Sequence, residues 1–473
     1  MTADFATLTA LELLAGYRRR EFSPVEVVSG MLARAERLNP QLCAFYLIDH
    51  DEALAAARES EARWTKDKPC GPLDGVPSSV KDALASKGHP SYRGSAAHRA
   101  DEQTWDTDVP GVARMRDAGA VFLGKTTMPD FGILPSGVSS RHGITRNPWN
   151  LARTSGGSSA GAAASIAAGI NPLAIGTDIV GSIRLPASYC GLVGHKPSYG
   201  RVPYYFPNSP ALVAGPMARD VADAALLMNV LAGPDKRDFT ALPPDGTDYS
   251  AVSRQPPRPG ARIGFCPSLG FGLNPDPEVV ALVGEAVRAM EADGASVRSI
   301  PELFSRADLL TAERFFKVRC RTELVTMPPH RRAEADVIEN WSAEADTISA
   351  VEFYALFSEV QRMRERAARI FDDLDFLILP SVHAPAFPAE LPGPDPRMPF
   401  EPFANSFLFN LTEQPASSVP CGYTHSGLPV GLQIVGQRYD DRGVFTHAAW
   451  LEAAIPTRRA QDALIKRLGD CAP

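Results

Sequence analysis

The sequence predicts an α/β protein. Short apolar runs of strand length occur at residues 173–175, 262–265, 376–380 and 430–435, and the last run is apolar enough for a strand buried on both faces. Longer segments with apolar residues at helical spacing, such as residues 277–293, lie between them. Apolar residues make up 44% of the 473-residue chain and charged residues 22%, which is typical of a globular protein with a large core.

Residues 1–65 are predicted to form a helical N-terminal arm. Ser23 and Glu26 form a capping box around Pro24, a favoured first residue of a helix, and the apolar residues that follow recur on one face. Such an arm covers either the core of its own chain or a second copy in a homodimer. The composition leaves both arrangements open.

The segment most suggestive of chemistry spans residues 154–200, where two glycine-flanked turns each contain serine. Gly157 allows the backbone to approach a ligand closely, and Ser159 is predicted to cap the alanine-rich helix that follows. In the turn at residues 179–182, successive N–H groups are expected to converge and to bind an oxyanion. Because Ser182 ends this turn, a nucleophile and its oxyanion donors would come from one piece of chain.

This segment resembles the amidase signature family, in which a Gly-Gly-Ser-Ser turn and a Gly-Thr-Asp…Gly-Ser-Ile-Arg turn carry two catalytic residues. The third is a lysine in a Gly-Val-Pro…Lys-Asp motif, which residues 75–82 match. The resemblance implies a single large domain, whereas length alone suggests about two or three. It also implies a large mixed β-sheet covered by helices on both faces. Residues 66–470 would form the catalytic domain, with a variable, substrate-determining region at about residues 300–400.

The resemblance assigns catalytic roles to Lys81, Ser158 and Ser182. Ser182 would attack an amide carbonyl, while Ser158, joined to Gly157 by a cis peptide bond, would relay the proton to Lys81. Lysine is a base only when uncharged, so burial must lower its pKa from roughly 10.4. The expected oxyanion donors are the backbone N–H groups of Ile179, Val180, Gly181 and Ser182.

Two positions depart from the family pattern, because Val180 and Ala160 stand where glycine is usual. Valine keeps its N–H, but its branched side chain narrows the permitted backbone angles, which affects the oxyanion turn and not the triad. Asp178 and Arg184 match the family. They either brace this turn or take part directly in catalysis.

Residues 119–126 match the phosphate-loop pattern letter for letter. A phosphate loop needs a strand before it and a helix after it. Here residues 112–118 have a helical pattern, residues 120–123 have a strand pattern, and Pro129 hinders a following helix. Nucleotide binding is therefore not predicted, and Met128 is expected in the wall of the active site.

Residues 157–161 satisfy the Gly-x-Ser-x-Gly elbow of α/β-hydrolases, with Ser159 as the nucleophile. That elbow follows a strand, whereas residues 147–155 are polar and turn-like. It also requires a downstream acid and histidine, and the available histidines have no recognisable setting: His383, His425 and His447. An esterase of this class is the first alternative function.

Apolar and aromatic residues near the predicted site favour a hydrophobic or aryl amide as the small-molecule substrate, with ester or carbamate cleavage as side activities. The expected substrate-binding residues are Met128, Phe131, Gly157, Tyr204 and Phe206. The aromatic residues are equally typical of a hydrophobic core, and both interpretations stay open. The second alternative function is the glutaminase-like subunit of a tRNA-dependent amidotransferase, which requires partner subunits. Residues 128–140 lack the usual pattern of those subunits.

Charge and cysteine content argue against several other classes. The net charge of −7 disfavours nucleic-acid and anionic-membrane partners, and no apolar run approaches the roughly 18 residues of a membrane span. The seven cysteines are scattered singly, as expected of reduced thiols in the cytoplasm. No group of potential ligands has metal-site spacing, so neither a metal nor a cofactor is expected.

Overall fold

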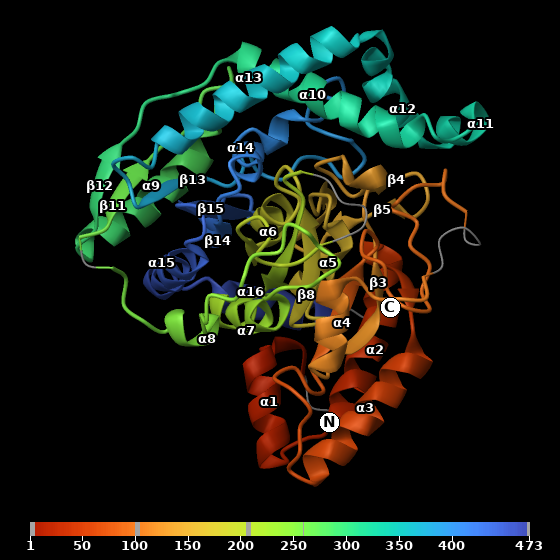
Figure 1. The fold of residues 1–473 in the computed structure, drawn as a ribbon. Helices are drawn as coiled ribbons and strands as arrows, with labels where there is room; N and C mark the ends of the chain where they lie inside the picture. Colours follow the sequence, from red (N-terminus) through yellow and green to blue (C-terminus); the bar gives the residue numbers. More distant parts are fainter. Residues whose placement is uncertain (1–4, 100–104, 205–209, 259, 471–473) are drawn as a thin grey trace.

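An 11-stranded mixed sheet runs through the computed structural model, which describes residues 5–99, 105–204, 210–258 and 260–470. The order of its strands is β1-β3-β2-β8-β10-β9-β14-β15-β13-β11-β12. Helices cover both faces (Figure 1), which confirms the predicted fold class. The strands of this sheet and of two small hairpins are β1 (Phe45–Ile48), β2 (Pro77–Lys81), β3 (Val121–Thr126), β4 (Val138–Ser139), β5 (Gly143–Ile144), β6 (Arg146–Asn147), β7 (Asn150–Thr154), β8 (Leu173–Asp178), β9 (Val193–Lys196), β10 (Val213–Ala218), β11 (Arg262–Phe265), β12 (Ser296–Ser299), β13 (Phe376–Pro380), β14 (Ala416–Tyr423) and β15 (Pro429–Gly436).

The helices vary from single turns to 20 residues. They are η1 (Phe5–Thr7), α1 (Ala10–Arg19), α2 (Pro24–Leu42), α3 (His50–Thr65), α4 (Pro110–Asp117), η3 (Asp130–Gly132), α5 (Ala160–Ala167), α6 (Arg184–Cys190), α7 (Val221–Leu231), α8 (Tyr249–Val252), α9 (Pro277–Ala292), α10 (Arg306–Leu324), α11 (Pro329–Arg332), η4 (Ala333–Ala335), α12 (Asp336–Ser342), η5 (Ala343–Thr347), α13 (Ala350–Arg369), η6 (Glu401–Phe403), α14 (Phe407–Leu411), α15 (Asp441–Ala454) and α16 (Arg458–Asp470). In the described part of the chain, no helix combines the length and hydropathy needed to cross a membrane.

Alternating strand residues supply the cores on the two faces of the sheet. Leu173 and Ile175 of β8 belong to the core formed with α4, α7, α9 and α15, while Ala174 between them packs with α5 and α6. Likewise, Ile378 of β13 faces the first core and Leu377 faces a core shared with α10, α13 and α14. Both faces of the sheet are therefore buried, as the apolar runs predict.

The parallel strands β3, β2 and β8 are neighbours, so their carboxyl ends meet at one edge of the sheet. Lys81 is the last residue of β2, and residues 179–182 follow β8 directly. The chain after β3 leads to Met128 and Phe131 at the same edge. This topology brings together segments that are about 50 to 100 residues apart in the sequence.

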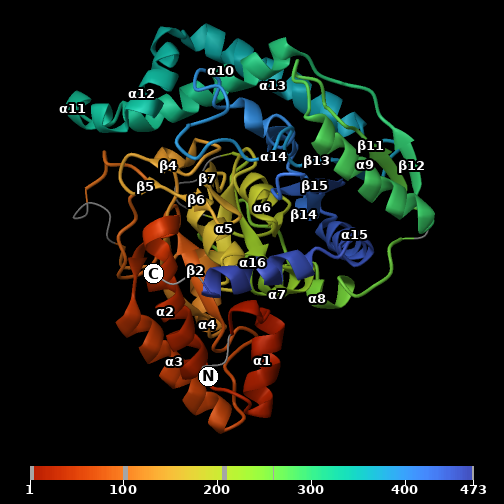
Figure 2. The same cartoon turned by 180° about the vertical axis from the view of Figure 1, so that it is seen from behind.

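The first 65 residues contain more than the expected helices. Ser23 and Glu26 form the capping box of α2, as predicted. However, β1 lies between α2 and α3 and pairs with β3 at the edge of the main sheet. The segment also packs against the C-terminal helix α16, because Arg34 Nη2 donates to the carbonyl of Ile465 at 2.7 Å. In Figures 1 and 2, α1–α3 lie at the opposite end of the molecule from α10, α12 and α13.

Residues 215–233 have apolar residues at helical spacing, but only the second part of this segment is a helix. The structure has strand β10 up to Ala218 and helix α7 from Val221. Asp220 separates the two elements, because its side chain accepts a hydrogen bond from the backbone N–H of Asp223 and so caps α7.

Candidate active site

Lys81 is fully buried and lies within hydrogen-bond distance of three hydroxyl groups. Its Nζ is 2.9 Å from Oγ of Ser158, 2.9 Å from Oγ of Ser159 and 2.9 Å from Oγ1 of Thr177. Burial lowers the pKa of Lys81 from 10.5 to about 7, since its charged form loses hydration. The carboxylates of Asp178 and Asp82 oppose this shift. A substantial share of Lys81 is therefore uncharged near neutral pH.

Ser158 and Ser182 line one small cavity at the sheet edge. The peptide bond between Gly157 and Ser158 is cis, as the resemblance implies. The buried Ser182 Oγ has no hydrogen-bond partner among the described residues. The contact between Lys81 and Ser158 is thus formed, whereas Ser182 contributes an uncommitted hydroxyl to the same cavity.

The turn after β8 is fixed by a buried ion pair. The Asp178 carboxylate accepts hydrogen bonds from Nη2 of Arg184 at 2.9 Å and from Nε of Arg184 at 3.1 Å. It also accepts one from the backbone N–H of Ile183 at 3.0 Å. Neither charged residue lines the cavity, so the geometry favours a bracing role for both. The backbone N–H of Gly181 donates to Asp178 at 2.8 Å, and it is thereby removed from the expected set of oxyanion donors. The remaining expected oxyanion donors are the backbone N–H groups of Ile179, Val180 and Ser182.

Ser159 holds Lys81 and does not face the cavity. It occupies the N-cap position of α5, but its side chain does not cap that helix. Instead, its hydroxyl accepts from Lys81 and donates to the Thr177 carbonyl at 3.3 Å. Sequence reasoning missed both this role and Thr177, although the position of Thr177 on a strand beside β2 was a usable signal. The preceding chain is less turn-like than expected, because β6 and β7 form a short hairpin.

The structure places three of the five expected substrate-binding residues in the cavity wall: Met128, Phe131 and Tyr204. Phe206 lies outside the described residues. Gly157 does not line the cavity but packs tightly against the backbone, since a Cβ built on it would lie 2.4 Å from the carbonyl oxygens of Leu134 and Ser136. Apolar residues that the sequence did not single out complete the wall, among them Leu212 and Ala83.

Two charged residues also line the cavity, and no pattern in the sequence indicates either of them. Arg93 comes from the loop between β2 and α4, and Arg319 comes from α10. Glu323 contacts both, at 2.5 Å from Nη1 of Arg93 and 3.3 Å from Nη2 of Arg319. The region at residues 300–400 therefore contributes directly to the wall of the site.

The phosphate-loop pattern at residues 119–126 forms a strand, as predicted. Its last six residues are β3, which is buried throughout. The Lys125 side chain donates to the carbonyl of Leu84 inside the protein. This lysine is therefore not presented on a loop where it would contact a phosphate.

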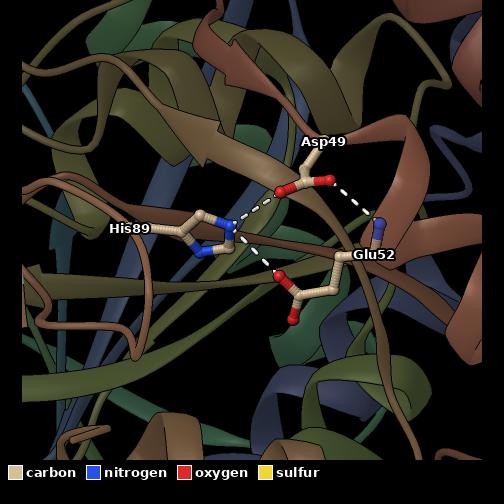
Figure 3. Close-up of side chains that lie close together, drawn as sticks. All are labelled: Asp49, Glu52 and His89. Atoms are coloured by element: carbon tan, nitrogen blue, oxygen red, sulfur yellow. Dashed lines mark hydrogen bonds and ion pairs between the residues drawn. The ribbon is translucent and has the colours of Figure 1, made fainter. Parts of the chain in front are cut away.

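One cluster has the donor atoms of a metal site, and Figure 3 shows it. His89 Nε2 lies 3.1 Å from Asp49 Oδ2 and 3.1 Å from Glu52 Oε2. Glu52 also pairs with Arg116 at 2.5 Å, and hydrogen bonding from His89 is the main reason that the pKa of Glu52 falls to about 2. Hydrogen bonding to Glu52 raises the pKa of His89 in turn. The contacts of His89 with two carboxylates account for this cluster without a cation.

Comparison with known proteins gives consistent matches along most of the chain. Residues 26–445 match the Amidase family model. The A subunit of the glutamyl-tRNA(Gln) amidotransferase of Methylococcus capsulatus is 36% identical over an alignment of 483 residues, covering 96% of this chain and 97% of that protein. An acylamidase of Rhodococcus erythropolis is 31% identical, covering 97% of this chain and 98% of that protein. The crystal structure of a bacterial aryl acylamidase superposes with a TM-score of 0.89 at 30% identity, covering 97% and 98% of the two chains.

Proposed function

The chain belongs to the amidase signature family and is an amide-hydrolysing enzyme, and we propose that its substrates are hydrophobic or aryl amides. The observation that carries this proposal is the wall of the cavity beside Ser182. Met128, Phe131 and Tyr204 line it together with aliphatic side chains, a surface suited to an apolar acyl or aryl group. The likeness to two acylamidases supports the same substrate class.

The reaction proceeds by two acyl-transfer steps in this proposal. Uncharged Lys81 accepts a proton from Ser158, which in turn takes the proton of Ser182 as the Ser182 oxygen attacks the amide carbonyl. Backbone N–H groups of Ile179, Val180 and Ser182 stabilise the oxyanion. Ser158 then protonates the leaving nitrogen as the C–N bond breaks, and water hydrolyses the acyl-enzyme by the reverse relay.

Two features of the site support this assignment of roles. The Lys81–Ser158 hydrogen bond at 2.9 Å supplies the first link of the relay. The link from Ser158 to Ser182 must form when substrate is bound, and catalytic hydrogen bonds often tighten at that stage. The Ser182 hydroxyl has no hydrogen-bond partner among the described residues and ends the turn that holds the expected oxyanion donors. It therefore fits a nucleophile better than Ser159, whose hydroxyl is hydrogen-bonded to Lys81 and to Thr177.

A substrate panel with matched variants tests the proposal. Wild-type protein should hydrolyse aryl amides faster than fatty, peptide or carbamate substrates. Lys81→Ala and Ser182→Ala should lose nearly all turnover while keeping a native circular dichroism spectrum, whereas Lys87→Ala, which removes an exposed lysine, should be fully active. Ser159→Ala should retain measurable activity. An inactive Ser159→Ala together with an active Ser182→Ala would instead support the esterase elbow.

The second candidate is an amidotransferase component, which the 36% identity to the Methylococcus capsulatus protein favours. That function predicts ammonia release from glutamine only in the presence of partner subunits, and little anilide hydrolysis by the purified chain. Our proposal predicts rapid anilide hydrolysis by the purified chain and negligible glutaminase activity. Measuring both activities on the same preparation separates the two.

We further propose that the enzyme acts in the cytoplasm on small molecules. All six cysteines in the described part of the chain are free thiols, which fits a reducing compartment. The proposal requires no partner protein for catalysis. Absence of anilide hydrolysis by the purified chain alone would contradict this independence.

A further inference from the structure

We propose that Arg93 and Arg319 bind a carboxylate group of the substrate in the cavity that Ser182 lines. This inference rests on the proposed function, because it adds a specificity element to the same site. The preferred substrate is then an amide that combines an apolar or aryl group with a carboxylate.

The cavity wall carries positive charge close to the nucleophile. Of the described residues that line it, Arg93 and Arg319 are the only charged ones. Arginine presents a planar fork of N–H donors that matches a carboxylate, and such charge-assisted hydrogen bonds are stronger than neutral ones. A wall that bound only a neutral aryl group would gain little from two partly buried guanidinium groups.

Glu323 holds the two guanidinium groups together. Its carboxylate contacts one nitrogen of Arg93 and one of Arg319. Both arginines line the cavity, whereas Glu323 does not. Because Glu323 lies in α10 one turn after Arg319, a single helix supplies both the second arginine and the carboxylate that orients the pair.

The Arg93 backbone is fixed by the strand that carries the catalytic lysine. Asp82, the neighbour of Lys81, accepts hydrogen bonds from the N–H groups of Tyr92 and Gly94, both at 2.7 Å. The Arg93 carbonyl accepts from the N–H of Phe131 at 2.8 Å. Arg93 itself has a φ of 50°, an uncommon value for a residue with a side chain. Its position relative to Lys81 is therefore set before substrate arrives, as expected of a binding group.

Matched substrate pairs test the inference. One pair carries the carboxylate on the leaving group, namely acetanilide and 4-acetamidobenzoate. The other carries it on the acyl group, namely the 4-nitroanilides of acetic and succinic acid. For at least one pair, wild-type kcat/KM should be about tenfold or more higher for the charged member. Arg319→Gln should abolish this preference by lowering kcat/KM for the charged member far more than for the neutral member, while Arg319→Lys should restore part of it.

Arg314→Gln is the matched control, since Arg314 lies on the same helix, pairs with Glu344 and does not line the cavity. It should behave as wild type. A wild-type preference for the neutral member of both pairs overturns the inference, and so does an equal loss for both members in Arg319→Gln, which would indicate a structural role.

Calorimetry with Ser182→Ala separates failure of this inference from failure of the proposed function. Tighter binding of 4-acetamidobenzoate than of acetanilide, lost in Ser182→Ala/Arg319→Gln, would support the carboxylate subsite even if wild type cleaved no anilide. Equal binding of the charged and the neutral member in both substrate pairs would overturn the inference, whatever the turnover.

Discussion

Replacing Asp178 by asparagine should destabilise the protein strongly and move its activity to lower pH. The Asp178 carboxylate is fully buried and neutralises Arg184, which is buried as well. Asparagine keeps the shape of the side chain but loses the charge. One of its two oxygen positions becomes an NH₂ group, which faces donors from Arg184 and from the backbone.

The magnitude follows from the cost of leaving a buried charge without its partner, about 3–5 kcal/mol. The other partners of Arg184 do not replace the lost charge, since they are the neutral acceptors Gln433, Asn410 and the carbonyl of Ser406. The carboxylate of Asp178 also raises the pKa of Lys81. Its loss should therefore lower the pKa of Lys81 further below its ordinary value.

Urea unfolding, followed by circular dichroism, should show the free energy of unfolding of Asp178→Asn reduced by about 3–5 kcal/mol. The acidic limb of kcat/KM should lie at lower pH than in the wild type. Asp395→Asn is the control, because that carboxylate pairs with Arg397 at the surface, and it should be indistinguishable from wild type. Unchanged stability, or an acidic limb displaced to higher pH, would refute the reasoning.

Three further predictions concern other parts of the chain. Wild-type kcat/KM should rise with pH through an acidic limb near 7, where Lys81 loses its proton, and a pH-independent rate between pH 5 and 9 would contradict the role of Lys81 as the base. Burial also lowers the pKa of Lys196 from 10.5 to about 7, so the unfolded chain binds more protons than the folded chain between these two pH values. The free energy of unfolding should therefore rise with pH across that range, and part of the rise should be absent in Lys196→Met. Gly157→Ala should be unstable and inactive because its Cβ would collide with two carbonyl oxygens. The control is Gly284→Ala on α9, where a Cβ would have no atom closer than 3.5 Å; its free energy of unfolding should rise by up to about 1 kcal/mol, which thermal unfolding can measure.

Local sequence rules were sufficient for several elements whose residues act within their own segment, although the cap predicted at Ser159 does not form. The capping box of α2 and the strand in the phosphate-loop pattern follow from neighbouring residues alone. The candidate catalytic residues Lys81 and Ser158 also lie in recognisable motifs, and the structure brings them into contact.

The rest of the site depends on contacts between distant segments, which no local pattern encodes. Arg319 follows a helical pattern like any solvated arginine, and only the packing of α10 over the sheet edge directs it into the cavity. Gly181 has the expected sequence context of an oxyanion donor, but the bond from its N–H to Asp178 becomes visible only in three dimensions. Strand β1 has only four residues between two helices, which is too few for an alternating apolar pattern to indicate a strand.

The separation between sheet and outer helix has an evolutionary consequence. The candidate catalytic residues Lys81 and Ser182 lie at or just after the ends of the adjacent parallel strands β2 and β8, whereas Arg319 and Glu323 lie on α10, outside the sheet. A lineage could exchange that single helix and acquire new selectivity while its reaction chemistry stayed intact. Transplanting α10 between homologues offers the laboratory version of the same exchange.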